Sequence, residues 1–135
     1  MATKFLERCE TIEECYEFLL AYAGQGLPGD EGNSAGSRVR NFLQRSADAI
    51  KGLAESCTEA VREIQLEPAA RYAAFCSVLQ RDASDSLAAV ELVLAQPSIS
   101  SQLVDNLNAS GHLRALLTDL FLIGEILRTH SIAGA

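Results

Sequence analysis

Apolar residues recur along this chain with the spacing of helices. Between positions 37 and 65, apolar or small side chains return every three or four positions, and polar side chains fill the positions between them. Residues three and four apart lie on the same face of a helix, so this spacing is typical of an amphipathic helix. No segment of useful length alternates apolar and polar residues as a β-strand does. The pattern predicts an all-α fold, an irregular antiparallel bundle of five or six helices.

Two helices are expected in the first half of the chain. Thr11-Ile-Glu-Glu14 has the form of a capping box, which predicts a helix from Thr11 to about Ala23, with a short separate turn of helix before it at 3–9. The second helix covers 37–65, with charged side chains of opposite sign paired on its outer face. If this helix is divided, we expect the break at Ser56 or Thr58, because their hydroxyls compete for backbone hydrogen bonds.

A glycine-rich segment, 24–36, separates these two helices. It contains five glycines and one proline, which predicts a flexible loop. Gly24, Gly26 and Gly29 match the letters of the dinucleotide-binding motif G-x-G-x-x-G. That motif requires a strand before it and free amide donors after it, whereas here a helix precedes it and Pro28 has no amide hydrogen. We interpret the segment as a loop and not as a nucleotide site.

Turn residues divide the second half of the chain as well. Pro68 suits the first position of a helix, and the polar run at 82–86 predicts a turn. Pro97 ends the next helix, and either Ser98 or Ser100 begins another. Together with a turn at 108–111, these signals predict helices over 68–80, 85–95 and 98–107 and a final helix after 111.

The final helix, over 113–127, is apolar around most of its circumference. A surface helix of a small domain needs an apolar face of only about 100°, and this face is about twice as wide. The helix is therefore expected to be central in its own fold or covered by a second chain. Its narrow remaining stripe contains Arg114, Thr118, Phe121, Glu125 and Arg128. Because a phenylalanine stands in the middle of that stripe, we predict an interaction surface formed by Leu116, Leu120, Phe121 and Ile123.

Composition limits the classes of partner. The 135 residues are 48% hydrophobic and 21% charged, which predicts a single globular domain over 1–135, with residues 131–135 fraying at its end. A net charge of −7 argues against binding to nucleic acid and to anionic membrane surfaces. No apolar run is long enough to cross a membrane, and the acidic start does not resemble a signal peptide. We therefore expect a cytoplasmic protein.

The four cysteines are expected to be free thiols and not metal ligands. Cys9 and Cys15 are six positions apart and Cys57 and Cys76 nineteen, and neither spacing is that of a zinc site. Cys57 and Cys76 fall on the inner faces of their helices and are expected in the core. Cys9, just before the predicted first helix, is expected to be the most accessible, and a redox or ligating role with Cys15 stays open.

The remaining motifs do not predict catalysis. Leu113–Leu117 reads L-x-x-L-L, a string found in docking helices, but in a helix this apolar it is better explained by core packing. The acidic stripe of Glu55, Glu59 and Glu63 lies on an outer helix face and is expected to be solvated. His112 and His130 fall at the ends of the last helix, without the residues that a phosphotransfer or di-iron site requires.

Three function classes follow from these observations. The first is a non-catalytic helical interaction protein, such as an adaptor, assembly factor or regulatory subunit, that forms a homodimer and binds a protein partner. The second is a bundle that binds a small molecule or a cofactor of unknown identity. The third is an enzyme whose site is not visible in the sequence, with the glycine-rich loop as its lid. Candidate polar groups for the second class are Cys15, Tyr16, Tyr22, Tyr72 and His112.

Overall fold

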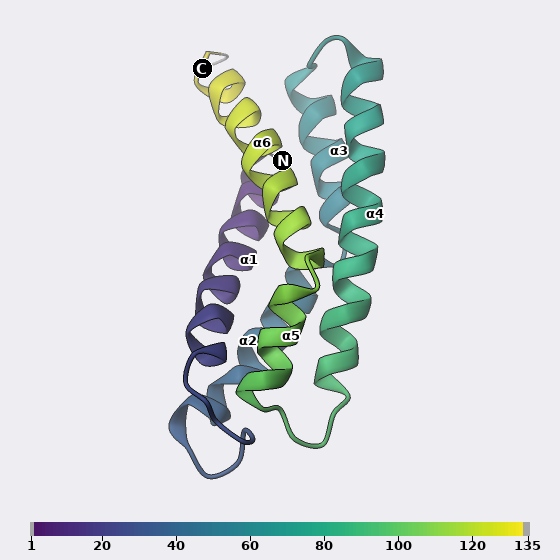
Figure 1. Cartoon of the computed structure of the whole chain (residues 1–135). Helices are drawn as coiled ribbons and strands as arrows, with labels where there is room; N and C mark the ends of the chain where they lie inside the picture. The colour runs from purple at the N-terminus through teal and green to yellow at the C-terminus, as the bar shows by residue number, and fades with distance from the viewer. Residues whose placement is uncertain (1, 134–135) are drawn as a thin grey trace.

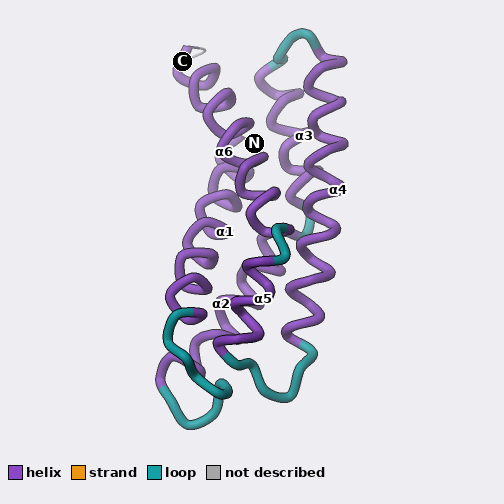
Figure 2. The backbone as a smooth tube through the Cα atoms, viewed as in Figure 1, coloured by secondary structure: helices purple, strands orange, loops and turns teal. Residues whose placement is uncertain are grey.

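The computed structural model of the protein describes residues 2–133. Within this range it has six helices and no strand, which confirms the predicted all-α bundle (Figure 1). The helices are α1 (Ala2–Ala23), α2 (Ser34–Ile50), α3 (Leu53–Ile64), α4 (Ala69–Leu94), α5 (Ser101–Ala109) and α6 (His112–Ala133). Both α1 and α4 pack against α2, α3, α5 and α6, so these two long helices hold the bundle together. Figure 2 shows the connections after α1 and α4 at one end of the bundle and the α3–α4 connection at the other.

The apolar face of α6 is covered within its own chain. Leu116, Leu120 and Ile123 are at most 2% exposed and lie in the single hydrophobic core. The L-x-x-L-L string at 113–117 is part of the same core, since its three leucines are all buried. α6 continues to Ala133, so the frayed tail expected at 131–135 is helical as far as the structure describes it, and residues 134–135 lie outside the described part.

The first helix begins earlier than the sequence suggests. Instead of capping a helix at residue 11, the Thr11 hydroxyl donates a hydrogen bond to the Glu7 carbonyl within a continuous α1. The preceding turns are stable because Phe5 and Cys9 are buried against the core. The capping-box prediction is therefore wrong, and the buried apolar residues before Thr11 are the physical reason.

The break between α2 and α3 lies at Gly52 and not at Ser56 or Thr58. Gly52 has a φ of 75°, a left-handed conformation that glycine adopts without steric cost. The end of α2 is stabilised by Arg8 of α1, whose Nη1 donates to the carbonyls of Asp48, Ala49 and Lys51 at 3.2, 3.1 and 2.7 Å. The last carbonyls of a helix have no partner within it, so the arginine acts as a cap from a distant part of the chain.

α4 is continuous through the segment where the sequence predicts a turn. Two of its polar residues in this segment, Asp82 and Ser86, contact α6 and do not cap a helix. Ser86 is fully buried and donates to the His112 carbonyl at 2.9 Å. The end of this region is as predicted, because the Ser100 hydroxyl caps α5 by accepting from the Leu103 amide at 3.0 Å.

The loop after α1 is anchored to the connection between α4 and α5. Leu27 and Ser101 exchange hydrogen bonds, and the Tyr22 hydroxyl donates to the Ile99 carbonyl at 2.7 Å. Asp30 accepts from the Ile99 amide and from Arg40 Nε, each at 2.7 Å. The loop is also shorter than expected, since Asn33 caps α2 and the helix begins at Ser34. These contacts join two segments about seventy residues apart along the chain.

Candidate functional site: a groove between α3 and α4

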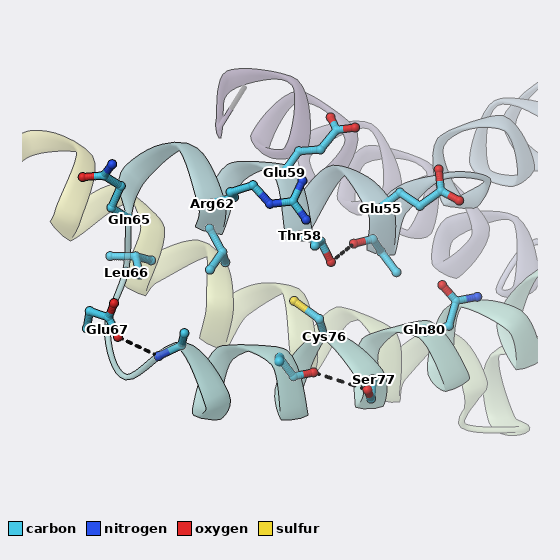
Figure 3. Close-up of a pocket in the computed structure, with 14 residues that line it drawn as sticks. Glu55, Thr58, Glu59, Arg62, Gln65, Leu66, Glu67, Cys76, Ser77 and Gln80 are labelled. Atoms are coloured by element: carbon cyan, nitrogen blue, oxygen red, sulfur yellow. Dashed lines mark hydrogen bonds between the residues drawn. The ribbon is translucent and has the colours of Figure 1, made fainter.

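The largest cavity described here is an open groove of about 1210 Å³ between α3 and α4. Figure 3 shows side chains from both helices lining it, with the short connection at one end. That connection is well held: the Leu66 amide donates to the Val61 carbonyl, and Glu67 accepts from the Ala69 amide at 3.0 Å. Gln65 turns the chain in a left-handed conformation with φ of 59°. The two helices therefore stay side by side while the space between them remains open.

Small side chains line both walls of the groove. Ala54 and Thr58 line it from α3, and Ala69, Ala73 and Ser77 line it from α4. The Thr58 hydroxyl donates to the Ala54 carbonyl at 3.1 Å, and the Ser77 hydroxyl donates to the Ala73 carbonyl at 3.3 Å (Figure 3). Both hydroxyls are thus satisfied by their own helices. Each helix presents its small residues at a spacing of four, which places them in one row on one face.

The charged side chains around the groove are mostly acidic. Glu55, Glu59 and Glu67 line it together with a single basic residue, Arg62, so its lining has a net charge of −2. All four are exposed. The prediction of an acidic outer stripe on α3 is confirmed at Glu55, Glu59 and Glu63, which all face solvent. The structure adds that the first two border a groove, which periodicity within one helix does not reveal.

Two cysteines meet beneath the groove. Cys76 lines the wall from α4, and its sulfur lies 3.8 Å from that of Cys57 on α3. Cys57 is fully buried, as predicted, whereas Cys76 is only partly buried. Burial, reinforced by the adjacent Cys76, raises the pKa of the Cys57 thiol above its usual range.

Cys9 is not the accessible thiol that the sequence suggests. It is 1% exposed, and burial raises its pKa to about 12. The prediction assumed a helix that begins after Cys9, whereas α1 carries it into the core. Cys15 is also fully buried, and burial raises its pKa to about 11. Both side chains are therefore held as neutral thiols at physiological pH.

The structure separates the four residues of the predicted interaction surface. Leu116, Leu120 and Ile123 face the core, so they are not available to a second chain in this fold. Phe121 is 58% exposed, and its neighbour Leu122 is 55% exposed. An interface on α6 would have to use this outward face, because α1, α3, α4 and α5 cover the inward one.

The polar groups considered for a small-molecule site do not converge on one cavity. Tyr22 and Cys15 are buried in the core, and His112 is exposed at the start of α6. Tyr16 lines a separate pocket of about 320 Å³ at α1 and α5, and Tyr72 is partly buried on α4. The groove between α3 and α4 contains none of the five.

One pair of carboxyl groups has an unusual environment. Asp119 of α6 lies beside Asp82 of α4, and burial together with this neighbour raises the pKa of Asp119 to about 7. The two groups repel each other when both are ionised. The pair is not part of a metal site: within residues 2–133, no cluster of three or more His, Cys, Asp or Glu side chains has an arrangement that would hold a metal ion.

Comparisons of the chain with protein-family models, with curated proteins and with solved structures found no match. Across the described residues, no helix combines the length and the apolar character needed to cross a membrane. The features of the described residues that offer a surface for function are the groove, the exposed face of α6 and the thiol pair.

Proposed function

We propose that this protein is a non-catalytic helical interaction protein whose α3–α4 groove binds a basic amphipathic helix of a protein partner. The observation that carries the proposal is the groove itself, which is long, open and walled by two antiparallel helices. Amphipathic helices commonly dock in grooves of this kind, with apolar side chains at helical spacing inserted between the walls.

The size of the groove fits a helix. α3 has 12 residues, which corresponds to a length of about 18 Å or about three turns. Small residues along both walls allow a docked helix to approach the backbone closely, since the side chains of Ala69 and Ala73 end at Cβ. Near the α3–α4 connection, the partly buried Val61 supplies apolar surface for a side chain of the partner.

The acidic lining of the groove favours a partner helix with positive charge. Three carboxylates and one guanidinium line it, on a chain whose net charge is −7. A partner helix with Lys or Arg on its polar face would be attracted to this rim and would associate faster at low salt. An acidic helix would be repelled by the same groups.

A synthetic amphipathic peptide with Leu and Ala on one face and Lys on the other tests the proposal. We expect titration of the peptide into the protein to shift the amide resonances of α3 and α4, with an affinity that falls as salt rises. The control peptide has Glu in place of every Lys, and we expect no binding from it. Shifts confined to other helices, or equal affinity for both peptides, would overturn the proposal.

Matched variants locate the binding. Ala73→Leu fills the groove, whereas Ala74→Leu makes the same change on an exposed position of α4 outside it. Glu59→Lys reverses a rim charge, and Glu17→Lys on α1 is its control. We expect the two groove variants to weaken peptide binding about tenfold and the two controls to leave it unchanged. A stoichiometric small molecule that copurifies with the protein and is lost in Ala73→Leu would instead indicate a ligand-binding bundle.

The proposal includes self-association through the outward face of α6. Phe121 and Leu122 are exposed there, and Arg114 and Glu125 lie on the same side of the helix. In an antiparallel pairing about a twofold axis between Thr118 and Phe121, Arg114 of one copy would lie beside Glu125 of the other. Such an interface is self-complementary in charge, as a twofold contact requires. We expect a weak dimer, because few large apolar side chains contribute to it.

We propose a cytoplasmic location, which the four free thiols support.

A further inference from the structure

Two thiols beside the groove lie close enough to suggest that they can form a disulfide bond. The sulfurs of Cys57 and Cys76 are 3.8 Å apart, and a disulfide bond would bring them to about 2.05 Å. The two cysteines belong to adjacent helices joined by a connection of only four residues, 65–68. The short connection keeps the two helices adjacent, and the bond requires the two sulfurs to approach each other by less than about 2 Å.

The two sulfurs differ in accessibility, and this difference sets the order of reaction. Cys76 lines the open groove, where a small reagent can reach it. Cys57 is fully buried behind it, and burial raises its pKa, so it is still a neutral thiol when the reagent reaches Cys76. Cys9 and Cys15 are at most 1% exposed and line neither the groove nor the pocket at α1 and α5. The groove thus directs a reagent to one of the four cysteines.

We propose that Cys57 and Cys76 are a reversible thiol modification site, oxidised by a low-molecular-weight disulfide to an intramolecular disulfide that links α3 to α4. The thiolate of Cys76 attacks one sulfur of the reagent, forms a mixed disulfide and releases the first small thiolate. Cys57 then loses its proton, attacks the Cys76 sulfur and releases the second small thiolate. Two protein thiols and one small disulfide become one protein disulfide and two small thiols. The proposal is independent of the partner suggested for the groove.

Glutathione disulfide is the probe, applied to the folded protein before alkylation of the remaining thiols and digestion with trypsin. Cleavage after Lys51, Arg62, Arg71 and Arg81 places Cys57 in peptide 52–62 and Cys76 in peptide 72–81. We expect these two peptides to appear linked, with a mass two hydrogens below their sum. Peptide 9–38 carries Cys9 and Cys15 and is the internal control, which we expect to remain alkylated at both positions.

Variants separate the two steps. In Cys57→Ala the second step is impossible, so we expect glutathione to remain on Cys76 as a stable mixed disulfide. In Cys76→Ala we expect Cys57 to remain unmodified while the protein is folded. The proposal is overturned if wild-type protein retains glutathione on Cys76 without forming the link, if peptide 9–38 reacts first, or if none of the four thiols reacts in the folded state. Since the decisive measurement uses wild-type protein, it does not depend on how well the variants fold.

Discussion

Replacing Asp30 by Ala should destabilise the protein more than any change to a surface ion pair. The Asp30 side chain is only 9% exposed and accepts two hydrogen bonds, from the Ile99 amide and from Arg40 Nε, each at 2.7 Å. Arg40 in turn donates to the carbonyls of Leu94 and Gln96, at 3.1 and 2.8 Å. One carboxylate therefore connects the loop after α1, the second helix and the end of α4.

The magnitude follows from these contacts. A hydrogen bond to a charged group contributes about 1.5–3 kcal/mol, and the Ala variant loses two of them. Arg40 is 37% exposed, so water compensates part of its loss. We therefore expect a cost of about 3 kcal/mol, against a total stability of about 5–15 kcal/mol for an ordinary domain. That corresponds to a fall in the melting temperature of about 10 °C for a chain of this size.

The effect should depend on pH in a defined direction. Burial alone would raise the pKa of Asp30, but the hydrogen bonds from Ile99 and Arg40 outweigh it and lower the pKa below its usual value. A carboxyl group with a lowered pKa stabilises the fold at pH values above its unfolded pKa, and this contribution disappears as the pH falls through the folded pKa. The difference between wild type and Asp30→Asn should therefore be full at neutral pH and shrink below about pH 4.

Urea unfolding followed by circular dichroism measures these differences. Together with Asp30→Ala, the Arg40→Gln variant and the variant with both substitutions form a double-mutant cycle. Its coupling free energy measures the contribution of the Asp30–Arg40 ion pair. The control is Arg45→Gln, because Arg45 and Glu14 form an exposed pair at 3.3 Å that should contribute less than about 1 kcal/mol. A cost for Asp30→Ala no larger than that of the control, or one independent of pH, would refute the reasoning.

Three further predictions concern α6. Asp119 has a pKa raised to about 7, so the folded state holds its proton more tightly than the unfolded state, and stability should fall as the pH rises from about 4 to about 7. Asp119→Asn should flatten this dependence and stabilise the protein at pH 8, as denaturation at several pH values would show; an unchanged profile would exclude a role for the Asp82 contact. Leu120→Ala should cost about 2–5 kcal/mol in the free energy of unfolding, because the side chain is 1% exposed, and a cost below about 1 kcal/mol would contradict its place in the core. Replacing Phe121 and Leu122 together by Ser should abolish the dimer in light scattering after gel filtration, whereas Leu92→Ser, at an exposed leucine on α4, should not. A protein that is monomeric at every concentration would contradict self-association.

The sequence predicts the helices best where burial and local signals agree. The structure contains both the helix predicted from the apolar periodicity of α6 and the predicted Ser100 cap, because each depends on residues close together along the chain. The capping box at Thr11 fails although its letters are correct, since buried Phe5 and Cys9 extend the helix beyond it. Asp82 and Ser86 fail as turn residues because each has a tertiary role against α6.

The candidate site is harder to predict, because it belongs to two helices at once. Ala69, Ala73 and Ser77 form a visible row of small residues at a spacing of four, yet such a row also occurs wherever helices pack closely. Only the relative placement of α3 and α4 shows that the row borders open space. The proximity of Cys57 and Cys76 is likewise invisible in a spacing of nineteen residues, since it depends on the path of the connection between their helices.

The contact of Arg8 with the end of α2 also has a meaning for how the chain becomes ordered. The three carbonyls that it caps lie forty or more residues away, so the corner between α2 and α3 is completed only when α1 has docked. Gly52 permits the corner, and the hydrogen bonds from the Arg8 guanidinium stabilise it. The apolar periodicity of the segment from α2 to α3 would by itself suit one continuous helix. Docking of α1 thus helps to fix the angle between α2 and α3. We expect the bundle to fold as one cooperative unit.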